Sequence, residues 1–322
     1  MKNLKILNEF YDKKNNYIIF NDSNIKLIKN IVNTNTSVLY FVDDFNVNDP
    51  VYDMFLNKNF NNLILITSKK PNIKRNNRLL SHSKINKEIF SYIKNNILVI
   101  IRLSNNYKYM KKVINNLIIL KDLLKVSNIK INKTFSNNGI NFVVIKDDTS
   151  SKYVSDILSS FEIISKDNIV EKYEYIYDKV CEYLDCEFSE NNFCDFKNNS
   201  CIANRNGYSS HSTMGCCYSF EYSKFWDPTF IKNIHVCNHL DCKTCNTKCI
   251  SCKLFTCEYL NRKNISFNVN NILLLDCFFN KKQLLIIKYN YFKKREEIIS
   301  KLLEHSNAPL LIYYFTKEYL IN

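Results

Sequence analysis

The stretch Ser37-Val-Leu-Tyr-Phe-Val42 is a continuous apolar run that stops at Asp43-Asp44. An unbroken run of this kind is typical of a strand that is covered on both faces, as in a parallel sheet. A shorter run precedes it and three similar runs follow it: Tyr17–Phe20, Asn62–Thr67, Ile97–Ile101 and Asn141–Ile145. The first half of the chain therefore predicts buried, mostly parallel strands.

Helical patterns lie between these runs. The clearest starts near Ser104 or Asn105 and has apolar residues at three-and-four spacing: Met110, Val113, Leu117, Leu120 and Leu124. Another follows Asn21 and Asp22, which can cap a helix. Alternating strands and helices imply right-handed crossovers, so we expect an α/β, Rossmann-like domain with flanking helices over residues 1–165.

Residues 166–322 predict a second domain of a different kind. A helical pattern covers residues 166–190, and the apolar stretch Ile272–Phe279 follows a cysteine-rich segment. The stretch Gln283–Leu303 predicts one amphipathic helix whose run Lys293-Lys-Arg295 lies on a solvated face. We expect residues 166–322 to form a cysteine-rich, metal-stabilised module with C-terminal helices.

The chain of 322 residues is basic, with 45 Lys and Arg against 31 Asp and Glu, a net charge of +14. A basic surface suits polyanions such as nucleic acid, but the abundance of Asn, Lys and Ile also fits an AT-rich genome. The densest basic group, a weak candidate for nucleic-acid contact, comprises Lys69, Lys70, Lys74, Arg75 and Arg78. With only 3 Gly, the chain has no glycine-rich phosphate loop.

Two absences bear on localisation. No apolar run approaches the ~18–20 residues that a membrane-spanning helix needs. The first ten residues alternate charged and apolar groups and lack the apolar core of a signal peptide. The sequence therefore predicts a cytoplasmic protein without a membrane partner.

Acidic pairs follow two of the predicted strands, at Asp43-Asp44 and Asp147-Asp148. Ligands of α/β folds sit beyond the carboxyl ends of the strands, where carboxylates can hold a divalent cation. Asp also ends strands and caps helices routinely, and no glycine-rich turn accompanies these pairs. We favour the structural interpretation.

The 13 cysteines are the most informative feature. None precedes Cys181, and all except Cys277 lie between Cys181 and Cys257. Because reducing compartments disfavour disulfides, dense thiols in a chain without a secretory signal indicate metal binding. Cys181 and Cys277, which lie in apolar helical patterns, are expected to act as small buried hydrophobic residues.

The candidate metal ligands share short spacings that let neighbouring thiolates reach one ion. Closely spaced thiolates suit both tetrahedral zinc and iron–sulfur clusters, so the identity of the metal stays open. His239, between two of these cysteines, is a further candidate ligand. The predicted ligands are Cys194, Cys201, Cys216, Cys217, Cys237, Cys242, Cys245, Cys249, Cys252 and Cys257.

Two resemblances follow from these motifs. The pattern over Cys194–Cys257, with Gly215-Cys-Cys217 and Cys252-Lys-Leu-Phe-Thr-Cys257, resembles cysteine-rich proteins of low-GC anaerobic bacteria and zinc- or iron-chelating cysteine cluster domains. This resemblance implies metal binding for the C-terminal part. The triplet Cys245-x-x-x-Cys249-x-x-Cys252 is similar to that of radical S-adenosylmethionine enzymes, which implies a four-iron cluster. In those enzymes barrel strands follow the triplet, whereas this sequence predicts helices there.

Three functions compete at this stage, and the sequence does not decide whether the protein is an enzyme. The first is a metal-binding protein that holds zinc or an iron–sulfur cluster in a redox, sensing or regulatory role. The second is a zinc-dependent nucleic-acid-binding protein. The third is a radical enzyme that uses Cys245, Cys249 and Cys252.

Overall fold

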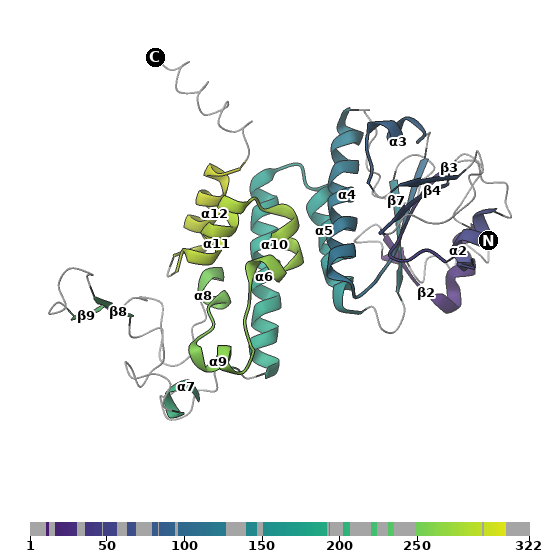
Figure 1. Ribbon diagram of the computed structural model, residues 1–322. Helices are drawn as coiled ribbons and strands as arrows, with labels where there is room; N and C mark the ends of the chain where they lie inside the picture. The colour runs from purple at the N-terminus through teal and green to yellow at the C-terminus, as the bar shows by residue number, and fades with distance from the viewer. Residues whose placement is uncertain are drawn as a thin grey trace, which may run out of the picture. The chain divides into compact units, whose positions relative to one another are not determined.

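The computed structural model divides the chain into two compact units, Met1–Lys166 and Asp167–Asn322 (Figure 1). The structure describes residues 11–12, 17–30, 36–46, 48–56, 63–68, 79–82, 84–93, 96–126, 140–146, 151–191, 193, 202–206, 220–223, 231–234, 249–291 and 293–306.

The first unit is an α/β fold built on a mostly parallel sheet. In its described residues seven strands occur in the order β1-β2-β7-β6-β3-β4-β5. Neighbouring strands pair in parallel except β1, which is antiparallel to β2. The strands are β1 (Tyr11–Asp12), β2 (Tyr17–Asn21), β3 (Thr36–Val42), β4 (Leu63–Thr67), β5 (Leu79–His82), β6 (Asn96–Arg102) and β7 (Ile140–Lys146).

The strand order contains a reversal between β3 and β6. From β3 the chain moves outward through β4 to β5, then returns to place β6 and β7 on the other side of β3. The connections that leave β3 and β6 therefore run in opposite directions. In open α/β sheets this switch point marks the crevice where ligands usually bind.

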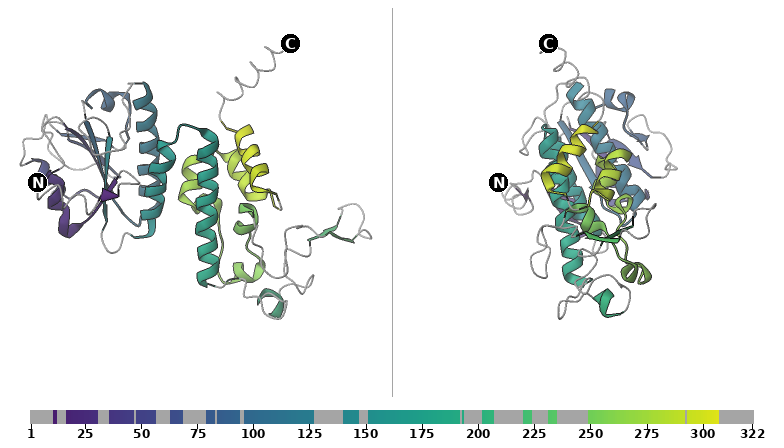
Figure 2. Two further views of the ribbon diagram at one scale, coloured as in Figure 1. Left: turned by 180° about the vertical axis from the view of Figure 1, so that it is seen from behind. Right: turned by 90° about the vertical axis from the view of Figure 1, so that its left-hand side faces the viewer.

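Helices cover both faces of the sheet (Figures 1 and 2). The 3₁₀ helix η1 (Asp22–Asn30) and α2 (Pro50–Leu56) share a buried core with Val38, Tyr40 and Val42 of β3. The helices α4 (Tyr107–Val126) and α5 (Val154–Ser165) lie on the opposite face. Every residue of β3 is buried, as expected for a strand covered on both sides.

The predicted Rossmann-like α/β class is confirmed, with two local differences. The helix predicted after Asn21 is a 3₁₀ helix, and the sequence did not predict the short strands β1 and β5. β5 consists of Leu79-Leu-Ser-His82, which is too short for a clear apolar run. The helices α3 (Lys87–Ser91) and η2 (Ser151–Tyr153) complete the unit.

Asp156, in the first turn of α5, is held in an unfavourable position for a carboxylate. Burial raises the pKa of its carboxyl from 3.8 to about 6, and Lys152 opposes this shift. A helix N-terminus normally favours a negative charge, so loss of hydration is the larger effect here. Asp156 therefore lowers the stability of the folded unit at neutral pH.

We expect Asp156→Asn to raise the free energy of unfolding of the first unit by about 1–3 kcal/mol at pH 7. In the native protein the unfolded state loses this proton near pH 4 and the folded state near pH 6. The native protein therefore loses stability between these values as pH rises, and the variant lacks this loss. Denaturant unfolding of both proteins across this pH range measures the difference. The same pH dependence of the free energy of unfolding in both proteins would contradict the raised pKa of Asp156.

The second unit is organised on the long helix α6 (Ile169–Asn191). Its buried residues recur at three-and-four spacing and face α8 (Ile250–Leu254), α10 (Leu273–Phe278) and α12 (Arg295–Glu304). The other described elements are α7 (Ile202–Arg205), α9 (Glu258–Arg262), η3 (Val269–Asn271), α11 (Lys281–Tyr289) and a hairpin of β8 (Phe220–Ser223) and β9 (Ile231–Ile234).

Gln283 of α11 links three parts of this helical core. Its Nε2 donates to Tyr173 Oη and to the carbonyl oxygen of Leu302, each at 2.8 Å. Its Oε1 accepts from the backbone N–H of Asn280 at 3.0 Å. Because buried amides are costly unless satisfied, these bonds fix the relative positions of α6, α11 and α12.

The single helix predicted over Gln283–Leu303 is wrong, because the structure has two helices there. Asn290 ends α11, and its side chain donates to the carbonyl oxygen of Ile286 at 2.8 Å. Such local side-chain bonds compete with helix continuation. A new helix then begins at Arg295.

Lys293 and Lys294 are exposed, as the predicted solvated face requires, and the partly exposed Arg295 also binds carboxylates of α6. Arg295 donates from Nε and Nη2 to both carboxylate oxygens of Asp178, at 2.7 and 2.8 Å. Its Nη1 donates to Glu174 at 3.1 Å. This bidentate arrangement ties α12 to α6.

No helix in the described ranges combines the length and the apolar character that crossing a bilayer requires.

Candidate functional site

Three of the predicted metal ligands lie in the described part of the chain: Cys249, Cys252 and Cys257. Two sets of predicted residues lie outside it and stay predictions. The first set comprises Cys194, Cys201, Cys216, Cys217, Cys237, His239, Cys242 and Cys245. The second, basic set comprises Lys69, Lys70, Lys74, Arg75 and Arg78.

The structure brings Cys249 and Cys252 together. Cys249 immediately precedes α8, and Cys252 lies within its first turn. Their Sγ atoms are 3.3 Å apart. A disulfide bond is about 2.05 Å long, so the two sulfurs are close neighbours without being bonded.

The backbone around this pair is held by contacts from two helices. The N–H of Ile250 donates to Tyr177 Oη of α6 at 3.1 Å, and Ser251 Oγ donates to the carbonyl oxygen of Ile287 of α11 at 2.6 Å. Ile250 and Ser251 are both fully buried. These bonds fix the two residues between the thiols, and so they preorganise the pair.

Each end of the short segment is anchored as well. Cys249 Sγ lies 3.5 Å from the carbonyl oxygen of Asn290. Lys253 is buried apart from a small part of its side chain and forms an ion pair with Asp185 of α6. Cys249, Ile250, Ser251 and Lys253 thus each have a defined contact with α6 or with α11 and its C-cap.

A third thiol, Cys181 of α6, lies near this segment in a different electrostatic state. Burial raises the pKa of Cys181 to about 12, although the Lys253 ammonium opposes the shift. A thiol with such a pKa stays protonated at neutral pH, and metal ligands must be deprotonated. This agrees with the predicted structural role of Cys181.

Cys257 packs elsewhere. It borders a small apolar cluster around Tyr259 and Leu260. Within the described residues, no group of three or more His, Cys, Asp or Glu side chains is placed to hold a metal ion. The described part of the chain therefore offers a pair of thiols, and not a complete ligand set.

The pair matches the geometry of half a tetrahedral site. With metal–sulfur distances of about 2.3 Å and tetrahedral angles, two thiolates on one zinc ion are about 3.8 Å apart. The observed 3.3 Å needs only a small rotation of one side chain to reach that value. The pair alone could supply two of the four thiolate or imidazole ligands that such a site needs.

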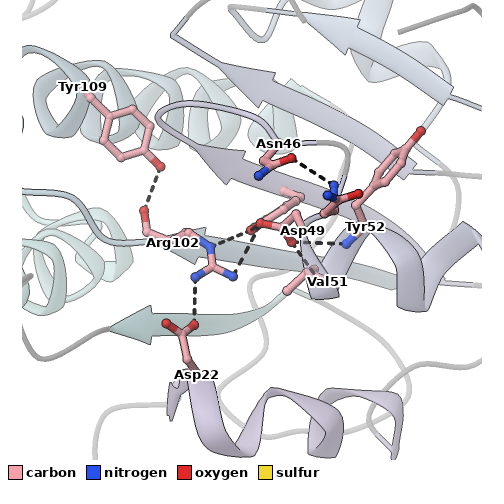
Figure 3. Close-up of polar contacts among 9 residues, drawn as sticks. Asp22, Asn46, Asp49, Val51, Tyr52, Arg102 and Tyr109 are labelled. Carbon is pink, nitrogen blue, oxygen red and sulfur yellow. Dashed lines mark hydrogen bonds and ion pairs between the residues drawn. The ribbon is translucent and has the colours of Figure 1, made fainter.

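A second polar cluster lies at the carboxyl ends of the strands, on the face of the sheet that η1 and α2 cover (Figure 3). Arg102, the last residue of β6, donates from Nε to Tyr40 Oη at 2.9 Å and from Nη1 to Asp22 at 2.8 Å. Tyr40 donates to the buried Asp49 at 2.9 Å, and Arg102 Nη2 lies 3.5 Å from the same carboxylate.

The charges in this cluster compensate one another. Burial disfavours the charged form of Arg102, but Tyr40, Asp49 and Asp22 outweigh it and raise the pKa of the guanidinium. Burial and then Asp49 raise the pKa of Tyr40, which stays protonated. Asp49 also caps α2, because its Oδ1 accepts from the N–H of Val51 at 2.8 Å. The cluster therefore joins η1, α2 and β6.

The acidic pairs predicted at the strand ends are only partly described. Asp43 Oδ2 accepts from Ser104 Oγ at 2.9 Å, and its carbonyl oxygen accepts from the N–H of Ser68 at 3.3 Å. These bonds tie the ends of β3, β4 and β6 together and agree with the structural interpretation. Asp147 and Asp148 lie outside the described residues.

Sequence reasoning missed the residues that build the second cluster. Two signals were available: Arg102 is a charge directly after the run Ile97–Ile101, and Asp49 precedes Pro50 at a helix start. Neither signal identifies the partner, because the contacts depend on strand order. Comparison of the chain with protein-family models, with curated proteins and with solved structures gave no match.

Proposed function

We propose that this protein binds a metal centre, zinc or an iron–sulfur cluster, through thiolates, and that Cys249 and Cys252 supply two of the ligands. The observation that carries the proposal is the 3.3 Å separation of two sulfurs on a segment that neighbouring helices hold in place. Preorganised ligands bind a metal more tightly, because less side-chain freedom is lost on binding.

The remaining ligands are assigned to the cysteine-rich segment that precedes the pair. Cys245 and Cys242 are the nearest thiols in the sequence, with His239 and Cys237 just before them. A tetrahedral zinc site needs four soft ligands in total, and a four-iron cluster needs up to four thiolates. Two ligands from this segment would complete either centre.

A sensing or regulatory role suits this site better than a purely structural one. Cys249 is 4% exposed, whereas Cys252 is only half-buried. One edge of the centre is thus reachable from solvent, which allows exchange of the metal or reaction of a thiol. A closed structural site normally shields all its ligands.

The other two functions gain no support from the described residues. Between Cys249 and Tyr291, and from Lys293 to Ser306, the structure has helices and no strand, so no barrel follows the cysteine triplet there. The basic residues considered for nucleic-acid contact lie outside the described ranges.

Metal analysis of the full-length protein tests the proposal. In protein purified anaerobically, we expect the metal content per chain of Cys249→Ser and of Cys252→Ser to be at least tenfold lower than that of wild type. The reason is that a hydroxyl is a poor substitute for a thiolate ligand. Elemental analysis measures the effect. A brown protein with iron and sulfide identifies a cluster, and a colourless protein with zinc identifies a zinc site.

Cys186→Ser is the matched control. Cys186 is an exposed thiol on α6, the same helix that anchors the pair. Its replacement by Ser should leave the metal content at the wild-type value. Equal metal content in wild type, Cys249→Ser and Cys252→Ser would refute the proposal. Circular dichroism of each variant shows whether the helices remain folded.

A further inference from the structure

The thiols of Cys249 and Cys252 have a second chemical possibility besides metal binding. Their sulfurs must approach by about 1.3 Å to form a disulfide, whose bond length is about 2.05 Å. The side chains occupy the boundary and first turn of α8, and residues three apart lie on the same side of a helix.

The two thiols differ in access to solvent. Cys249 is buried at 4% exposure and lies behind the C-cap residue Asn290, whereas Cys252 is half-buried. A dissolved oxidant therefore meets Cys252 first. Among the described thiols near this segment, Cys181 lies within α6 and is only partly exposed.

We propose that Cys249 and Cys252 form a thiol–disulfide switch, in which Cys252 reacts with a small-molecule disulfide and Cys249 resolves the product. The metal-linked half of this proposal rests on the proposed function: closure of the disulfide and metal binding exclude each other. Neither sulfur of a disulfide is a thiolate, so closure removes two ligands at once. Oxidation would then release the metal.

The exchange proceeds through a mixed disulfide. The Cys252 thiol loses its proton and attacks one sulfur of the external disulfide, whose S–S bond breaks; the departing thiolate takes up that proton. The Cys249 thiol then attacks Cys252 Sγ and breaks the mixed disulfide, and its proton goes to the second departing thiolate. Two protein thiols are oxidised, and one external disulfide is reduced to two thiols.

The chain itself provides a clean readout. Trypsin cleaves after Lys248 and after Lys253, which releases Cys249-Ile-Ser-Cys-Lys253 with both thiols and no other cysteine. Full-length, metal-free protein is incubated anaerobically with oxidised glutathione, quenched in acid, alkylated and digested. Mass spectrometry then shows whether this pentapeptide is reduced, closed or joined to glutathione.

In wild type we expect a pentapeptide that is lighter by two hydrogen atoms and carries no alkyl group. Cys249→Ser should accumulate glutathione on Cys252, and Cys252→Ser should react at Cys249 at least tenfold more slowly. Cys186→Ser should behave as wild type. A wild-type pentapeptide that stays reduced overturns the switch, and equal reaction rates of the two pair variants overturn the assigned order.

A second arm separates the switch from the proposed function. Protein loaded with Zn²⁺ should close at least tenfold more slowly than metal-free protein. If both forms close at the same rate although zinc stays bound, mutual exclusion is refuted. If the chain holds neither zinc nor an iron–sulfur cluster but closes in the predicted order, the proposed function fails and the dithiol switch stands.

Discussion

Removal of the proposed metal with a high-affinity chelator is expected to change the emission of Trp226 and to leave the first unit folded. Trp226 is the only tryptophan in the chain and belongs to the cysteine-rich segment that precedes Cys249, so its fluorescence reports on that segment alone. A structural zinc ion in a small domain contributes about 10–16 kcal/mol of binding free energy. That is comparable to the ~5–15 kcal/mol by which a typical domain is stable.

Removal of the proposed metal should affect the cysteine-rich segment and leave the first unit unchanged. The first unit has its own continuous core, with Tyr40, Phe41 and Leu65 fully buried, and shares none of the predicted ligands. Its denaturant transition should therefore be unchanged by chelation, and zinc added back should restore the Trp226 emission. Unchanged emission after complete metal removal would show that the ion does not organise the segment.

The second large effect is expected for Arg102→Ala, which should lower the free energy of unfolding of the first unit by about 3–5 kcal/mol. The substitution leaves the carboxylate of Asp49, 8% exposed, without its cation, and it removes a donor from Tyr40. The hydrogen bonds that Asp49 accepts from Tyr40 and Val51 remain, but a buried carboxylate is costly once its compensating cation is removed, because its lost hydration is then only partly replaced. Denaturant unfolding of the intact chain measures the change.

Asp22→Asn provides the matched control for the same guanidinium. The Asp22 side chain is 56% exposed, so its ion pair with Arg102 is solvated and contributes at most about 1 kcal/mol. The expected order is therefore a large loss for Arg102→Ala and a small one for Asp22→Asn. Similar losses of unfolding free energy in the two variants would mean that the buried contacts of Arg102 with Tyr40 and Asp49 contribute no more than its exposed ion pair with Asp22.

The strands were predictable because their burial on both faces leaves an unbroken apolar run. The segments of β3, β4, β6 and β7 show this. The helical period of apolar residues over Met110–Leu124 likewise predicted α4. The division of Gln283–Leu303 was not predictable from period alone. The apolar spacing continues across Asn290, and only the local hydrogen bonds of that residue end the helix.

The sequence predicted the pair of thiols in the candidate site, but it did not predict the residues that hold the pair in place. The spacing of Cys249 and Cys252 brings their sulfurs together through local backbone geometry, which a sequence reveals. The contacts that hold the pair come from Tyr177 and Ile287, far away in the chain. Long-range contacts of this kind depend on helix packing, which no local pattern encodes.

The position of β2 in the sheet has a consequence for biosynthesis. β2 is the first parallel strand to leave the ribosome, yet its only parallel neighbour among the described strands is β7, the last to be made. Ile18 cannot pair with Val143 until nearly the whole first unit has been translated. The parallel pairing of this N-terminal edge is therefore expected to form late, after most of the first unit has been translated, and to be slow because it joins residues far apart in the sequence.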